Sequence, residues 1–331
     1  MSVTRPESWT YVSGRVAALE GALLSADALD RLAGADSPSA AAAALADSPL
    51  RSVAAEARTP AEAAAAVEAH YSAAREGLRA DCPDESFFGL IELPAVCRGL
   101  KERVREAAAD SASAQSALAA LASGLSAGRL REGVELLGPV LPTDRRPEAA
   151  LAADLALDSA RLLEALELAG RLGSQSVAAH VADEVRVRSA LVAWRGRLAV
   201  SREGASAALG EWLPRLFLRG ELARDLAGAL WEADLPRWPG LIAGRLSPRL
   251  AGEAFGEGGA ERLTGWERAA FDWLTARARE LRSAAFGVER AWGYAWALAV
   301  EERNVRLALV GRLRGVEPEA IRELLWEPFC G

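Results

Sequence analysis

The sequence predicts an all-α protein, and three observations carry the prediction. Of the 331 residues, 73 are Ala, and Ala, Leu, Arg and Glu dominate the composition; all four are strong helix formers. Aromatic residues make up only 6% of the chain and β-branched runs are scarce, so a large sheet is not expected. Apolar residues recur at helical spacing in the last third, as at Trp266, Ala270 and Leu274.

Capping signals predict short helices in the first part of the chain. Pro6 is typical of an early helix position, and the pattern stays helical to about Leu24. Ser37-Pro38 and Ser48-Pro49 are each typical of a cap followed by the first helical residue. Thr59-Pro60 predicts a longer helix that ends near residue 80.

Longer helices are predicted further along, separated by punctuated segments. We expect helices over about 94–110, 148–172, 174–198, 266–281, 288–313 and 317–326, with an irregular pattern interrupted by Gly and Pro between 201 and 259. Gly173 is typical of a helix C-terminus. Residues 138–147 are predicted to be a polar linker, in which Arg145 and Arg146 form a solvated turn or a contact to an acidic partner.

The charged residues narrow the function classes. The chain has 39 basic and 46 acidic residues, a net charge of −7, so it carries no overall positive charge that would attract nucleic acid or anionic lipid. Lys101 is the only lysine, and no Ser or Thr follows it. A phosphate loop of the G-K-[ST] type needs a Lys followed directly by Ser or Thr, so we expect no direct nucleotide binding.

Cysteines and histidines give no pattern typical of a cofactor or metal site. The three cysteines, Cys82, Cys97 and Cys330, form no CxxC pair and indicate a reducing compartment. His180 and Glu184 are spaced to face one ligand, but no second His lies near, so a surface or half-buried His180 is expected. We therefore predict no cofactor and no metal.

Two matches to enzyme motifs occur in unsuitable contexts. The GxSxG at Gly124–Gly128 follows a helix-prone stretch, whereas a nucleophile elbow needs a strand there, so a helix end or loop is expected. The Gly cluster at 256–259 follows no strand and predicts a turn. No segment is long and apolar enough to predict a membrane span, and the first residues have no apolar signal core. An enzyme is the least favoured function class.

Three segments share one pattern and predict an internal repeat. They begin at Glu92, Asp183 and Glu301, and each has a Val four residues later, a small residue seven later and a Leu eight later. Offsets of four and eight share a helix face, so the Val and Leu columns are expected to pack inward. The spacing predicts three helical repeats over 1–110, 111–205 and 206–331.

Both ends of the chain resemble a known family. Phe286-Gly287 and Tyr294 precede EERNVRLALVGRLRGVEPEAIRELL, which runs from Glu301 to Leu325. This order of a Phe-Gly step, an aromatic-containing helix and an acid-x-x-Asn-apolar-Arg step resembles the C subunit of V/A-type ATP synthases, the family of the vacuolar ATPase d subunit. The opening YVSGRV at Tyr11–Val16, followed by Leu19, Leu23 and Leu24, also looks like that family's opening.

The resemblance implies three similar helical bundles around a pseudo-threefold axis, forming a funnel. The family often has the acid-x-x-Asn step in earlier repeats too, but here Ala95 and Arg186 occupy the Asn positions, and Asn304 alone keeps it. The residues themselves also allow Glu301 and Asn304 to lie at a solvated helix edge, with Glu302 and Arg306 as a surface ion pair. The candidate structural or partner-interface residues are Glu301, Asn304, Arg306, Asp183, Arg186 and Glu92.

The function implied by the resemblance is mechanical coupling without catalysis. Family members link the rotor axle subunits of D and F type, in the soluble catalytic sector, to the membrane proteolipid ring. Torque then couples ATP synthesis or hydrolysis to proton or sodium transport. The chain would lie at the cytoplasmic face of the membrane as a peripheral part of the complex. The alternative is an Ala-rich helical scaffold or adaptor unrelated to ATPases.

Overall fold

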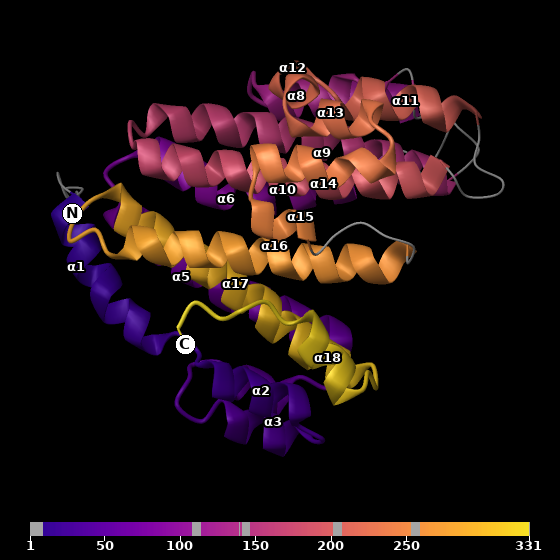
Figure 1. Cartoon of the computed structure of the whole chain (residues 1–331). Coiled ribbons are helices and arrows are strands. Elements are labelled where there is room, and N and C mark those ends of the chain that lie inside the picture. Colours follow the sequence, from indigo (N-terminus) through magenta and orange to yellow (C-terminus); the bar gives the residue numbers. More distant parts are fainter. Residues whose placement is uncertain are drawn as a thin grey trace. The chain divides into compact units, whose positions relative to one another are not determined.

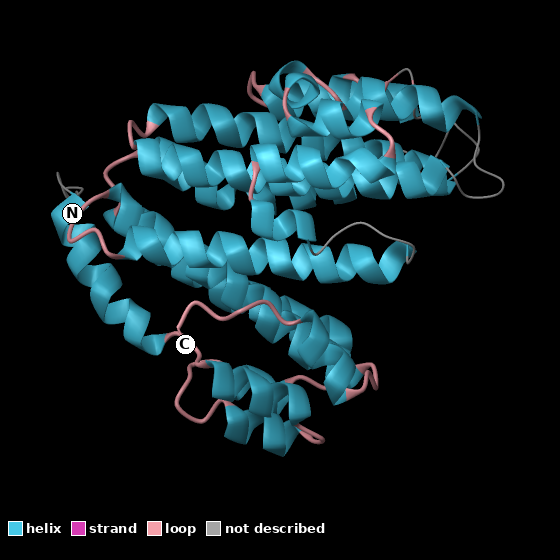
Figure 2. Cartoon of the chain, viewed as in Figure 1, coloured by secondary structure: helices cyan, strands magenta, loops and turns pink. Residues whose placement is uncertain are grey.

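The computed structural model describes residues 9–107, 114–138, 140, 146–200, 207–252 and 259–330. Within these ranges the chain forms helices and loops with no strand, apart from one isolated bridge between Ser25 and Cys330 (Figure 2). The all-α prediction is therefore confirmed. None of the helices in the described part is long and apolar enough to span a membrane.

The helices follow one another along the chain as labelled in Figure 1. They are α1 (Trp9–Leu19), η1 (Glu20–Ala22), α2 (Ala26–Gly34), α3 (Pro38–Ala44), α4 (Arg51–Glu56), α5 (Pro60–Asp81), α6 (Glu85–Ala107), α7 (Ala114–Ser123), α8 (Arg129–Glu135), α9 (Arg146–Arg171) and α10 (Gln175–Val200). The remainder are α11 (Ala207–Phe217), α12 (Gly220–Arg224), α13 (Leu226–Glu232), η2 (Leu235–Arg237), α14 (Trp238–Arg245), α15 (Pro248–Gly252), α16 (Gly259–Arg282), α17 (Val288–Leu313) and α18 (Pro318–Leu324).

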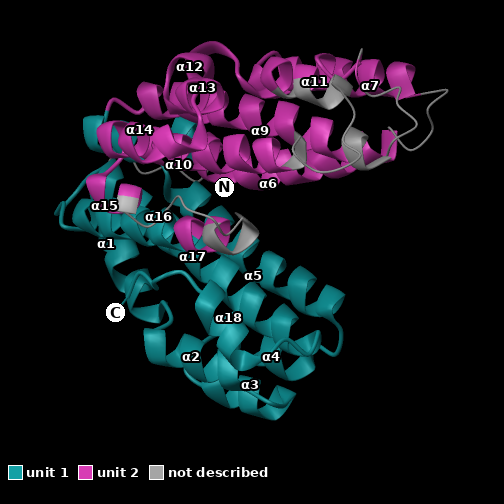
Figure 3. Ribbon diagram, turned by 45° about the vertical axis from the view of Figure 1, so that its right-hand side comes forward, with its two compact units in different colours: residues 1–88, 174–180, 268–331 teal, residues 89–173, 181–267 magenta. Residues whose placement is uncertain are grey.

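The chain divides into two compact units (Figure 3). Unit 1 comprises residues 1–88, 174–180 and 268–331, and unit 2 comprises residues 89–173 and 181–267. The chain passes from one unit to the other within α6, α10 and α16 and at the α9–α10 turn. The predicted repeat boundaries at 110/111 and 205/206 lie outside the described residues, so the three-repeat division stays a prediction.

Unit 1 is organised around α17. This helix packs against α5 most extensively and also against α1, α2 and α18. Its bounds agree with the predicted 288–313. The core of the unit includes the fully buried aromatic residues Tyr71, Phe87 and Phe271. Aromatic residues bury much apolar area, so a few of them stabilise a unit whose helices are otherwise rich in Ala.

Unit 2 packs short helices on α9. A run of buried Ala along α9, including Ala156 and Ala160, lets α8 approach closely. A Cβ atom added at Gly133 of α8 would lie 2.8 Å from the Ala160 Cβ, so Gly is required at this helix crossing. The indole ring of Trp194 meets those of Trp238 and Trp266 edge-on, at centroid distances of 6.1 and 6.5 Å. These three buried Trp rings form an aromatic cluster in the core of unit 2.

The capping predictions are confirmed at two of three positions. Ser37 accepts a hydrogen bond from the Ala40 N–H at the start of α3, and Thr59 forms a full capping box with Glu62 at the start of α5. Ser48 is different: its Oγ accepts from the Leu50 N–H, and α4 begins only at Arg51. The Ser48-Pro49 pair therefore forms a turn before the helix, and Leu50 occupies the N-cap position of α4.

The prediction that a helix starts at Pro94 is wrong. Helix α6 begins at Glu85 and contains Pro94 in its interior. An interior Pro costs about 3 kcal/mol of helix stability. Here Pro94 is exposed, and buried residues continue past it at helical spacing, at Leu90, Leu93, Cys97 and Leu100. Packing of this apolar face in unit 2 outweighs the local cost.

The inward packing expected for the Val and Leu columns of the three segments is seen in two of them. Val187 and Leu191 are buried, as are Val305 and Leu309, so both columns pack inward in these helices. In the first segment Leu100 is buried but Val96 is 50% exposed.

Some predictions concern residues that the structure does not describe. These are Pro6, most of the linker up to Arg145, the side chain of Arg146, and the Gly cluster before α16.

Candidate functional site

Three of the buried polar residues of unit 1 lie close together on α17. Glu301, Glu302 and Asn304 are 9%, 8% and 0% exposed, in the middle of a helix that has otherwise apolar buried positions. A buried polar group destabilises the fold unless it is hydrogen-bonded. Each of these three residues ties α17 to a different part of unit 1, and together they define the candidate site.

Asn304 ties α17 to the residues that follow α18. Its Nδ2 donates to the Trp326 carbonyl over 2.9 Å, and its Oδ1 accepts from the Trp326 N–H over 3.0 Å. One side-chain amide thus satisfies both backbone polar groups of Trp326. Asn304 is not at a solvated helix edge, which was the alternative that its spacing from Glu301 allowed.

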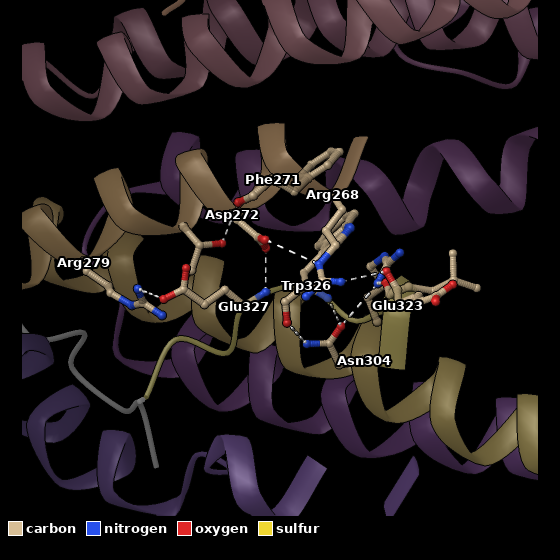
Figure 4. A network of polar contacts seen from close by, with 11 residues as sticks. Arg268, Phe271, Asp272, Arg279, Asn304, Glu323, Trp326 and Glu327 are labelled. Carbon is tan, nitrogen blue, oxygen red and sulfur yellow. Dashed lines mark hydrogen bonds and ion pairs between the residues drawn. The ribbon is translucent and has the colours of Figure 1, made fainter. Parts of the chain in front are cut away.

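The Trp326 ring is held between two side chains (Figure 4). The ring of Phe271, on α16, stacks on one side at a centroid distance of 3.9 Å and an interplanar angle of 8°. The guanidinium carbon of Arg303, on α17, lies 3.8 Å from the ring centroid. Aromatic stacking and cation–π contact each stabilise such a ring by about 0.5–1.5 kcal/mol.

The backbone around Trp326 is bonded by charged side chains of α16 and α17. Arg268 donates to the Glu323 carbonyl and Arg303 to the Leu324 carbonyl, over 3.1 and 2.9 Å. These carbonyls end α18 and have no partner within that helix. Asp272 accepts from the Glu327 N–H over 2.6 Å, and Arg279 donates to the Phe329 carbonyl over 3.0 Å and to the Pro328 carbonyl (Figure 4).

Glu301 ties α17 to α5 and to the start of the chain. Its carboxylate accepts from the Leu24 N–H over 2.5 Å and from the Tyr71 hydroxyl over 2.9 Å. Burial raises the pKa of Glu301, and the two hydrogen bonds offset that only in part. Burial, together with the neighbouring Glu301 charge, also raises the pKa of Tyr71.

A small cavity lies beside Glu301. Its volume is about 10 Å³, enough for the centre of one water molecule. It is lined by Leu23, Leu24, Leu29, Ala297, Glu301, Pro328, Phe329 and Cys330. The first and last described segments of the chain therefore meet at this carboxylate, and Cys330, which belongs to no recognisable motif, is part of the contact.

Glu302 connects α17 to α5 through two arginines. Arg75 donates to one carboxylate oxygen over 2.7 Å and Arg306 to the other over 2.8 Å. Arg306 also lies 3.4 Å from Glu68. The Glu302–Arg306 pair was expected on the surface; it is instead half of a buried bridge, because the Tyr71 and Arg75 side of α5 covers this face of α17.

His180 is fully buried in unit 1, so the expectation of a surface or half-buried residue is wrong. Its Nδ1 accepts from the Trp292 indole N–H over 3.1 Å, and its Nε2 lies 3.0 Å from the Leu274 carbonyl. These partners define a neutral ring with its proton on Nε2. The ring also meets Trp296 edge-on at 4.8 Å. Its role is packing between α10, α16 and α17.

The other candidate residues lie in unit 2 and do not join the α17 residues in one cluster. Arg186 donates to Asp183 over 3.1 Å and to Asp225 over 2.8 Å, and Asp183 is 6% exposed. This bridge ties α10 to the junction of α12 and α13. Glu92 is half-buried on α6. The six predicted residues thus divide between two separate polar networks and Glu92.

The residues that could support chemistry are held in structural contacts. Lys101 lies 2.8 Å from Asp158 and 3.5 Å from Asp154. Burial raises the pKa of the Cys97 thiol to about 11, so the reactive thiolate is disfavoured. The GxSxG stretch is a loop between α7 and α8, as expected. In the described part of the chain, no three His, Cys, Asp or Glu residues gather where a metal ion could bind.

Sequence reasoning missed the partners of Asn304. Trp326 was placed at the end of a helix over 317–326, but α18 ends at Leu324 and Trp326 lies in an extended segment. The signal was Pro328, which disfavours helix at Glu327 before it. Asp272 and Arg279 are seven residues apart on α16 and share the helix face that meets this segment. Nothing in the sequence around them indicates that they bind a backbone.

No protein-family model matches the chain, and no curated protein matches it.

Proposed function

We propose that the chain is a non-catalytic central-stalk coupling subunit of a rotary V/A-type ATP synthase or ATPase. It links the rotor axle subunits of D and F type to the membrane proteolipid ring. In this proposal the helices form three similar bundles around a pseudo-threefold axis, with the axle end held in a funnel. The chain is then a peripheral component at the cytoplasmic face of the membrane, and torque passing through it couples ATP turnover to proton or sodium transport.

One observation supports the proposal above the others. The two stretches that resemble the C subunit family come from opposite ends of the sequence, and in the structure they pack on each other within unit 1. The Gly287 N–H donates to Ser13 Oγ over 3.1 Å, Arg290 donates to Glu20 over 2.9 Å, and the Leu24 N–H donates to Glu301. A chance likeness at two distant stretches gives no reason for direct contact between them.

The polar contacts of α17 suit a part that transmits force. A rotor component must resist twisting, so its helices need fixed positions relative to one another. Glu301, Glu302 and Asn304 fix α17 to the start of the chain, to α5 and to the segment after α18, through directional bonds away from water. Buried and satisfied networks of this kind specify one arrangement of a core. In the proposal, these residues act by holding the shape that receives the axle.

Native mass spectrometry of the host membrane tests the proposal. The chain is isolated with a mild detergent, and its companions are identified by mass. The proposal expects axle subunits and proteolipid in one particle with the chain at one copy. A stable particle that contains the chain but no ATPase component supports the alternative, a helical scaffold or adaptor, and overturns the coupling function.

A further inference from the structure

The segment after α18 is bound by the rest of unit 1 as an extended peptide is bound by a protein. We call residues Leu325–Cys330 the strap. The strap is neither helix nor strand, apart from the single bridge of Cys330 to Ser25. In Figure 1 it runs in yellow from α18 back toward the end of α1. We call the residues that hold it the strap site: Phe271, Asp272, Arg279, Arg303 and Asn304.

The strap site binds backbone atoms. Asn304 satisfies both the N–H and the carbonyl of Trp326, Asp272 accepts from the N–H of Glu327, and Arg279 donates to the next two carbonyls. All these partners are side chains on α16 and α17. Hydrogen bonds to the main chain do not depend on the side chains of the bound segment. In peptide recognition they supply affinity for any extended segment of the right length.

Two aromatic side chains of the strap supply selectivity. Trp326 lies between Phe271 and Arg303, and is 9% exposed. Phe329, three residues on, is 4% exposed, and its ring approaches Gly293 of α17. A Cβ added at Gly293 would be in ordinary contact with the Phe329 ring at 3.7 Å but only 3.1 Å from the Ala278 carbonyl, so the glycine mainly allows α16 and α17 to approach closely beside that ring. Buried aromatic anchors dominate the energy of most interfaces.

We propose that the strap site is a recognition site for extended peptides with a Trp and a Phe three residues apart, and that it accepts such a peptide from another molecule when the strap is out of it. The contacts that hold Trp326 and the strap backbone are non-covalent and come from side chains on α16 and α17, while Cys330 at the end of the strap also meets Ser25 and the Glu20 carbonyl. A separate peptide of the same sequence meets the same donors, acceptors and ring surfaces. The inference does not depend on the coupling function.

The strap itself sets when the site is open. A segment joined to its own site by a short connection competes at an effective concentration of about 1 mM or above. A free peptide at micromolar concentration therefore does not displace it in the unmodified chain. Replacing Trp326, the main anchor of the strap, lowers this competition and leaves the five site residues unchanged.

A peptide-binding measurement on the full chain tests the proposal. The probe is a fluorescent peptide with the sequence of Glu323–Cys330, carrying Cys330→Ser to prevent oxidation. The receptor is the full chain with Trp326→Leu, which keeps an apolar side chain but loses the stacked ring. Fluorescence anisotropy is expected to show one saturable site, with affinity at least tenfold above that of the unmodified chain. A peptide with Trp326→Leu is expected not to bind.

A second change distinguishes the strap site from other surfaces. Adding Asn304→Leu to the Trp326→Leu chain removes the bonds to the peptide backbone, and we expect it to abolish saturable binding. If circular dichroism shows that the Trp326→Leu chain is unfolded, the Phe329→Ala chain is used as the receptor in its place. The peptide is then expected to raise the melting temperature of the Phe329→Ala chain and not that of the unmodified chain. A folded variant with no peptide binding, or binding that Asn304→Leu leaves unchanged, overturns the proposal.

Discussion

The Asn304 amide bonds both backbone polar groups of Trp326, 22 residues further along the chain. Both partners are buried, so neither group can turn to water when the bond is lost. An Asn side chain has a donor and an acceptor on one rigid plane, which is why it can replace a backbone partner. This relation makes Asn304 part of the fold, whatever partner the chain binds.

Replacing Asn304 by Leu is expected to destabilise the chain strongly. The change leaves the Trp326 N–H and carbonyl buried without partners, at a cost of about 1–3 kcal/mol for each unsatisfied group. We expect the free energy of unfolding in urea to fall by about 2–6 kcal/mol. Ala299→Leu, on the exposed face of the same helix, is the matched control and is expected to stay within about 0.5 kcal/mol of the unmodified chain. Equal stability of both variants would show that the bonds to Trp326 contribute little.

Glu301 is expected to make stability decrease as the pH rises. Its pKa is raised in the folded chain above the ordinary value of 4.5, because burial disfavours the charge. A raised folded pKa gives stability that is fully present below the unfolded pKa and is lost as the pH rises through the folded pKa. Glu301→Gln keeps an acceptor for the Leu24 N–H and does not titrate.

The difference in unfolding free energy between the unmodified chain and Glu301→Gln isolates this group. Urea melts are made at a series of pH values from 4 upward. The unfolding free energy of the unmodified chain relative to Glu301→Gln is expected to fall as the pH increases, and to level off above the folded pKa of Glu301. A difference that is constant with pH, or that moves the other way, would refute a raised pKa at this position.

Arg75 and Glu302 are expected to be energetically coupled. Arg75→Met removes one of the two arginines on the buried carboxylate, and breaking a buried pair from one side costs about 3–5 kcal/mol. Glu302 keeps Arg306, so we expect a loss near the lower end of that range. In a double-mutant cycle with Glu302→Leu, the combined loss is expected to be smaller than the sum of the single losses by at least about 0.5 kcal/mol. Strict additivity would mean that the bridge is unimportant.

The purified chain is expected not to bind ATP. Its only lysine, Lys101, lies against Asp154 and Asp158, and no Ser or Thr follows it. Titration of Mg-ATP into the full chain in a calorimeter is therefore expected to give only the heat of dilution. A stoichiometric site of micromolar affinity would identify the chain as a nucleotide-binding protein and not a coupling component.

Much of the helical structure of this protein follows from local sequence signals. The Thr59 capping box, Gly173 with its positive φ of 70°, and the apolar spacing of α17 each identify an element from neighbouring residues. Pro94 shows the limit of this approach, because its local cost predicts a helix boundary that packing along α6 overrides. Local signals decide an element only where the tertiary contacts agree with them.

The candidate site could be predicted only on its α17 side. Glu301 and Asn304 stand out by their spacing, but their partners Leu24, Tyr71 and Trp326 are distant in sequence and apolar or aromatic. An aromatic residue in an apolar segment predicts burial and does not reveal that its backbone is the polar partner. The side of the site formed by tertiary contact has no signature in one sequence.

Ion pumping by membranes of the host tests the coupling function most directly. Membrane vesicles are prepared from cells with and without the gene for this chain, and ATP hydrolysis is measured together with ATP-driven uptake of protons and of sodium. The account predicts that vesicles without the chain lose ATP-driven ion uptake, and that adding back the purified chain, or its Ala299→Leu form, restores it. Unchanged ATP-driven uptake of both ions in the absence of the chain would contradict the account.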